Sequence, residues 1–127
     1  IEDAVFNCQA QRIGHGWQII DGCQYKNETY IPDSKIAQYV LDKQIPLEIC
    51  ISSNVKSGAS SVTIENHPAI KLLKSGFKVT LNSDNRLMAK TKISEEFKKA
   101  ENYLELDGNL HSQLVKNAID ARFTNLK

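Results

Sequence analysis

The spacing of apolar positions changes along the chain. In some segments they recur about every 3.6 residues, as in a helix, and in others about every 2, as in a strand. Residues 17–31 follow neither period and are predicted to be mostly connection. The predicted elements are, in order, a helix in 1–11, a strand in 12–16, a helix opening at Pro32 and Asp33, a strand in 46–51, a helix between His67 and Gly76, a strand in 77–81, a helix from Ser94 and a last helix over 110–119. This alternation predicts an α/β fold in which crossover helices join parallel strands.

Polar residues follow each of the three predicted strands. They are residues 14–16 (GHG), 52–54 (SSN, expected as a loop) and 82–85 (NSDN). In parallel α/β folds, ligands bind at the carboxyl ends of the strands. The sequence therefore predicts that these three segments converge on one rim.

Three residues on this rim are candidates for chemistry, and each has a plain structural alternative. His15, between two glycines, is either a turn residue or a base, an electrostatic group or a ligand. Asp84 is either a turn carboxylate or a metal ligand or general base. Asn85 is either a turn residue or an amide that hydrogen-bonds a substrate. His67 before a proline and Trp17 are expected to be structural, and Glu48 stays undecided between an internal pair and the site.

The composition excludes several classes of protein. The 127 residues are 41% hydrophobic and 24% charged, with 16 basic against 15 acidic side chains. No apolar stretch approaches the roughly 20 residues of a membrane helix. The sequence contains no run of basic residues of the kind that binds nucleic acid. The three cysteines form no Cys-x-x-Cys pair, which favours a reducing, cytoplasmic location. A start at Ile1 is expected to be internal or processed.

Three motifs, taken together, resemble the adenosine deaminase family. They are residues 12–16 (RIGHG), residues 46–50 (PLEIC) with 52–54 (SSN), and residues 81–85 (LNSDN). The resemblance covers essentially the whole chain, residues 1–127, and implies the C-terminal portion of one TIM-barrel domain. A complete barrel has about 250 residues. The expected fold is therefore a partial (β/α)8 barrel, with its last three strands, their helices and the C-terminal helices.

The resemblance also implies an activity: hydrolytic deamination of adenosine or deoxyadenosine to inosine or deoxyinosine plus ammonia, with one zinc ion. It implies that His15 is the catalytic histidine, Asp84 a zinc ligand and Asn85 the residue that contacts the purine. Many family members have a second aspartate where Asn85 stands, and the run 84–88 (DNRLM) is typical of some bacterial members.

The family's remaining zinc ligands, a His-x-His pair and a His-x-Gly-Glu motif, do not occur in this sequence. The chain is therefore expected to need the N-terminal part of the barrel and to be inactive alone. Two alternatives remain open. One is an adenine or AMP deaminase of the same superfamily, and the other is a small α/β module that binds a ligand without catalysis.

Overall fold

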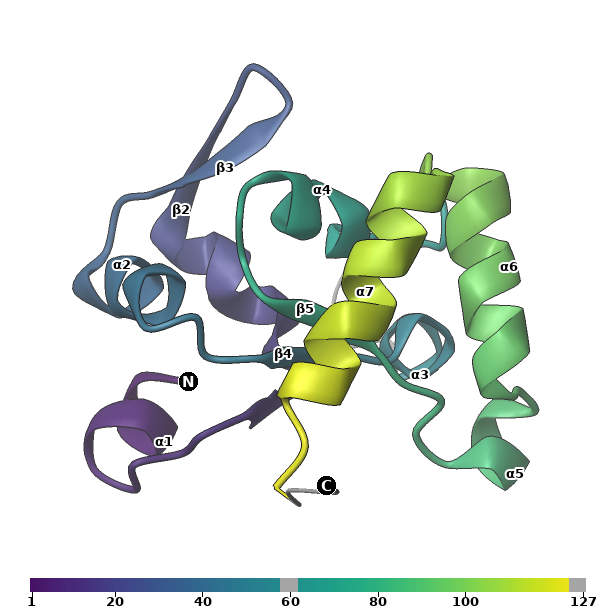
Figure 1. Cartoon of the computed structure of the whole chain (residues 1–127), viewed down its shortest axis with the longest axis horizontal. Coiled ribbons are helices and arrows are strands. Elements are labelled where there is room, and N and C mark those ends of the chain that lie inside the picture. The colour runs from purple at the N-terminus through teal and green to yellow at the C-terminus, as the bar shows by residue number, and fades with distance from the viewer. Residues whose placement is uncertain (58–61, 124–127) are drawn as a thin grey trace.

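The computed structural model describes residues 1–57 and 62–123, and its centre is a three-stranded parallel sheet (Figure 1). The strand order is β1 (Ile13–Gly14), β4 (Leu47–Ile49), β5 (Val79–Leu81). The register pairs Ile13 with Leu47 and Leu47 with Val79. All three strands therefore end at the same edge, as the sequence predicted.

Within the described residues, α-helices pack around the sheet, one before β1 and the others after strands. They are α1 (Glu2–Phe6), α2 (Lys35–Asp42), α3 (Ile51–Lys56), α4 (Ala69–Lys74), α5 (Arg86–Ala89), α6 (Ile93–Tyr103) and α7 (Gly108–Asp120). Leu47 and Val79 of the sheet are fully buried, and α7 lies across β5 with Leu114 facing inward. This order of parallel strands and helices confirms the α/β prediction and matches part of a (β/α)8 barrel.

The prediction of mostly connection for residues 17–31 is wrong. The segment forms a 3-10 helix, η1 (Gly16–Gly22), and then an antiparallel hairpin of β2 (Cys23–Lys26) and β3 (Thr29–Pro32). Asn27 and Glu28 make its two-residue turn with φ of 50° and 62°. Positive φ at both turn residues suits the right-handed twist of a hairpin.

Several helix ends also differ from the prediction. Ser34, not Asp33, caps α2, because its Oγ accepts from Ala37 N at 3.2 Å. Ser94 lies inside α6 and does not cap it. Residues 52–54, expected as a loop, belong to α3. Gly76 does follow α4 with a φ of +91°, as a helix-ending glycine should. The serine- and glycine-rich sequence over 56–61 also predicts a loop, and residues 58–61 of it lie outside the described residues.

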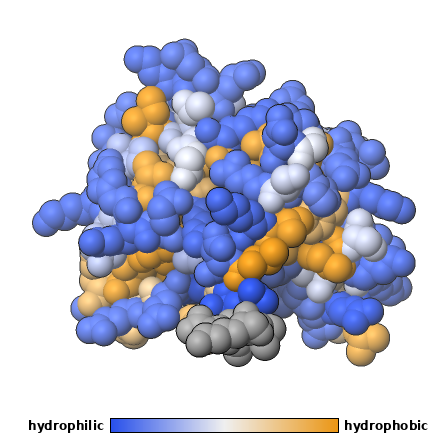
Figure 2. Space-filling view, viewed as in Figure 1, coloured by the Kyte–Doolittle hydropathy of each residue, from blue (hydrophilic) through white to orange (hydrophobic). Residues whose placement is uncertain are grey.

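Figure 2 shows several apolar areas in orange, and one of them lies beside α7. Its exposed members include Ile93, Val115 and Ile119, which border a groove floored by Leu81 and Leu114. In the described part of the chain, no helix is both long enough and apolar enough to span a bilayer.

Candidate functional site

His15 stands where β1 ends and η1 begins. Its φ is +53°, in the left-handed region, and its side chain is about half exposed (49%). The next residue must be small, because a Cβ on Gly16 would lie 2.7 Å from Leu47 Cδ2. The tight Gly-His-Gly turn thus directs the imidazole out of the sheet edge.

Asp84 comes from the far side of the sheet, three residues after β5, and meets His15 at the rim. His15 Nε2 lies 3.8 Å from Asp84 Oδ2. Ser53, in the first turn of α3, donates its hydroxyl to the same oxygen at 2.6 Å. Asp84 also has a positive φ of 50°. The three segments that the sequence predicted to converge therefore do so.

Asn85 lies next to Asp84 and caps α5. Its Oδ1 accepts from Met88 N at 3.0 Å, and the residue is exposed. Two adjoining hollows open at this rim. One is lined by His15 and Trp17, the other by Asp84 and Asn85, and both share Ser53.

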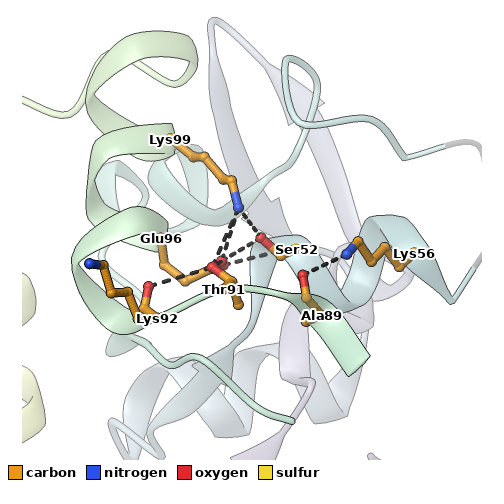
Figure 3. Close-up of polar contacts among 7 residues, drawn as sticks. All are labelled: Ser52, Lys56, Ala89, Thr91, Lys92, Glu96 and Lys99. Carbon is orange, nitrogen blue, oxygen red and sulfur yellow. Dashed lines mark hydrogen bonds and ion pairs between the residues drawn. The ribbon is translucent and has the colours of Figure 1, made fainter. Parts of the chain in front are cut away.

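A buried carboxylate, that of Glu96, joins segments next to this rim, and Figure 3 shows its contacts with Ser52, Thr91 and Lys99. Glu96 of α6 is fully buried. Its Oε2 accepts from Ser52 N at 3.0 Å, and its Oε1 accepts from the hydroxyls of Ser52 and Thr91, the latter at 2.7 Å. Lys99 Nζ lies 3.4 Å from Oε1. Glu96 therefore ties α3, which carries Ser53, to the segment that follows α5.

These contacts determine the charge of Glu96. Burial alone would raise its pKa, but the hydrogen bonds from Ser52 and Thr91 and the charge of Lys99 together lower it below its ordinary value. The carboxylate is thus charged at neutral pH. A second link between the same segments is the donation from Lys56 Nζ to Ala89 O at 2.5 Å.

The remaining candidate residues have structural roles. Glu48 pairs with Arg12 at 3.2 Å on the sheet. His67 is buried, and burial lowers its pKa to about 4, so its ring is neutral. Trp17 is buried too, as expected. Burial, and secondarily the charge of Asp84, raises the pKa of Cys50 to about 12, so this neighbour of the rim remains a neutral thiol.

Sequence reasoning missed the two polar residues that organise the rim from inside, Asn54 and Glu96. Asn54 lies 3.0 Å from His15 Nδ1, and it was noted only as part of a polar run. In the sequence, Glu96 is one of two acidic residues just after Ser94, where a negative charge favours the start of the predicted helix. No local pattern distinguishes either from a surface residue, because their partners come from other segments.

A family model described as Adenosine deaminase matches residues 1–127, the whole chain. The chain belongs to the adenosine deaminase family. The adenosine deaminase of Mycobacterium marinum is 43% identical to it over 96 residues, which are 76% of this chain and 26% of that protein. The chain thus spans about a quarter of the length of this curated relative.

Solved structures agree on the fold. An adenine deaminase from Arthrobacter aurescens superposes with a TM-score of 0.84 and 24% identity over 98% of this chain and 35% of its own. An amidohydrolase from Burkholderia ambifaria with bound Zn superposes with a TM-score of 0.76 and 20% identity over 98% of this chain and 32% of its own. The fold of this adenosine deaminase family member is therefore that of about a third of each of these chains, a partial (β/α)8 barrel.

Proposed function

We propose that the protein that contains this chain deaminates adenosine and deoxyadenosine hydrolytically, and that this chain supplies His15, Asp84 and Asn85 to its active site. The observation that carries the proposal is the meeting of His15 and Asp84, 3.8 Å apart at the carboxyl ends of β1 and β5, in a member of the adenosine deaminase family.

The Asp84 carboxylate at the rim suits one ligand position of a zinc ion that this chain would share with the rest of the barrel. Asp84 offers a carboxylate, one of the ligand types zinc takes in proteins, and its side chain is 38% exposed at the open end of the sheet. Among the described residues no group of three His, Cys, Asp or Glu side chains could hold a metal. We therefore propose that the other ligands come from an N-terminal part of the barrel. Bound zinc would lower the pKa of a water molecule and so supply the nucleophile.

The chain's own side chains then have separate tasks. Asp84 would hold the metal, and Ser53 keeps one carboxylate oxygen in place through its 2.6 Å hydrogen bond. His15 faces that carboxylate, and its imidazole would orient and electrostatically support the attacking oxygen of the nucleophilic water. The Oδ1 of Asn85 already accepts a hydrogen bond from Met88 N at the start of α5. Its NH2 group is therefore the part that would donate to the purine N7. An amide donates at any pH, whereas an aspartate must first be protonated.

We further propose that this chain alone is inactive and that the protein works in the cytoplasm. We expect the chain alone to be inactive because the remaining zinc ligands would come from the rest of the barrel. The cytoplasmic location is supported by the three cysteines, which are all free thiols in the structure.

The test is a deaminase assay on the full-length polypeptide with zinc, offering adenosine, deoxyadenosine, adenine and AMP separately. We expect turnover of the two nucleosides, and its loss in Asp84→Asn and His15→Gln. Asp120→Asn, at the exposed end of α7, is the matched control and should retain full activity. Preference for adenine or AMP would replace the proposed substrate class. Absence of any turnover by a folded, zinc-loaded protein would favour a binding module.

A further inference from the structure

The side chain of Asn54 lies buried directly beneath His15. Only 6% of Asn54 is exposed, although it belongs to a helix at the open rim. Trp17 (6% exposed) and His67 (1%) enclose it, with their ring centroids 5.9 Å apart. A buried amide must satisfy its donors and acceptor within the protein.

Two neighbours with fixed roles determine how this amide is oriented. Trp17 Nε1 can only donate, and it lies 3.2 Å from the atom that is therefore Oδ1. The Cys50 carbonyl can only accept, and it lies 2.9 Å from the atom that is therefore Nδ2. The opposite orientation would set donor against donor and acceptor against acceptor.

This orientation decides which nitrogen of His15 carries a proton. Asn54 Oδ1 lies 3.0 Å from His15 Nδ1, and an amide oxygen can only accept. Nδ1 must therefore carry the hydrogen. The second hydrogen of Asn54 Nδ2 points to His67 Nε2 at 3.2 Å, so every polar atom of the amide has a partner. Because Nε2 accepts, the neutral His67 ring carries its hydrogen on Nδ1, opposite the Ala69 N–H at 3.3 Å. This orientation satisfies the contacts with Trp17 and the Cys50 carbonyl, whose roles are fixed, and gives up only that longer contact from Ala69.

We propose that Asn54 is a positioning residue for His15. It holds the imidazole as the Nδ1–H form and fixes the plane of the ring. Nε2, 3.8 Å from Asp84 Oδ2, is then the nitrogen that faces the reacting atoms and the one free to accept a hydrogen bond or proton. The proposal rests on the proposed function of His15. It extends that function by assigning the tautomer of His15 to Asn54, which lies buried beneath the imidazole.

The test is the side-chain ¹⁵N spectrum of His15 in the full-length, zinc-loaded polypeptide, labelled at histidine and assigned by the signal lost in His15→Gln. At a pH where the imidazole is neutral, we expect a protonated Nδ1 and an unprotonated Nε2 in the wild-type protein. Asn54→Asp keeps an acceptor in the same place and should keep this pattern. Asn54→Leu removes the acceptor and should lose it, with kcat lowered roughly tenfold to a hundredfold and KM little changed, as when an orienting partner is removed.

The matched control is Asn117→Leu. Asn117 is also a half-buried amide, but it donates to Val79 O at 2.9 Å and does not contact His15. It should reduce stability and leave the His15 pattern unchanged. A protonated Nε2 in the wild-type protein, or an unchanged pattern and kcat in Asn54→Leu, would overturn the proposal. If the wild-type protein deaminates no purine, the proposed function fails, while the His15 spectrum still decides whether Asn54 fixes the tautomer.

Discussion

Ser53 donates a 2.6 Å hydrogen bond to Asp84 Oδ2 and so joins two segments that follow different strands of the sheet. Ser53 is in the first turn of α3, after β4, and Asp84 follows β5. The same oxygen faces His15 Nε2. Ser53 thus holds the carboxylate from one side while the imidazole faces it from another.

Removing this hydroxyl should weaken zinc binding. We expect Ser53→Ala to lower zinc affinity and kcat roughly tenfold to a hundredfold in the full-length protein, because partners that orient a metal ligand have effects of this size. Competition with a chelator measures the affinity. Ser112→Ala, which removes an exposed hydroxyl bound to Gly108 O, is the control. Unchanged zinc affinity in Ser53→Ala would show that Asp84 keeps its place without Ser53.

The buried Glu96 network should dominate the stability of the region behind the rim. Glu96→Gln keeps the shape of the side chain but sets an amide against Ser52, Thr91 and Lys99. We expect it to lower the free energy of unfolding by about 1–3 kcal/mol, the usual effect of unsatisfying a buried polar group. Urea unfolding measures this. Glu101→Gln, on the exposed face of the same helix, should change stability by less than about 0.5 kcal/mol. Equal effects of the two variants would contradict the assigned role.

How much of this was predictable from sequence depends on how far apart the partners lie. The rim was predictable because parallel strands end at one edge, so residues 14–16 and 82–85 had to meet there. The place of Asn85 beside Asp84 follows from the chain itself.

The missed features have physical reasons. The hairpin over 23–32 was missed because its turn, Asn27–Glu28, adopts two positive φ values without the glycine that usually signals such a turn. Residues 52–54 looked like a loop because serine and asparagine favour turns by bonding nearby backbone. In the structure the Ser52 hydroxyl donates to Glu96 and the Asn54 amide oxygen accepts from His15, so neither oxygen competes for a backbone N–H of the helix.

Acid should destabilise the protein through His67. Burial, partly opposed by the charge of Glu96, lowers the pKa of His67 from 6.5 to about 4. Between these values the unfolded chain binds a proton that the folded protein excludes. The contribution of His67 to the free energy of unfolding should therefore be largest above pH 6.5 and decrease as the pH drops towards 4. The total decrease from this residue should be on the order of 3 kcal/mol.

Urea unfolding at pH 7 and pH 5 measures this dependence. In His67→Gln the difference between the two pH values should shrink, because the titrating group is gone. His111→Gln, which removes a half-buried ring packed 4.7 Å from Phe97, should keep the wild-type dependence. A His67→Gln protein with an undiminished difference would assign the acid sensitivity to other groups.

The isolated 127-residue chain should self-associate. β1 and β5 are the outer strands of the three-stranded sheet, so each presents backbone N–H and C=O groups without a strand partner on its outer side within the described residues. Beside β5, the groove bordered by Ile93, Val115 and Ile119 leaves apolar surface in water. Open edges and apolar surface both favour pairing with other chains. Sedimentation velocity should show oligomers or aggregates, and adding the N-terminal part of the barrel should convert them to a defined complex. A monodisperse monomer with a sharp thermal transition would instead mean that the edges are protected, and that the chain folds as a unit of its own.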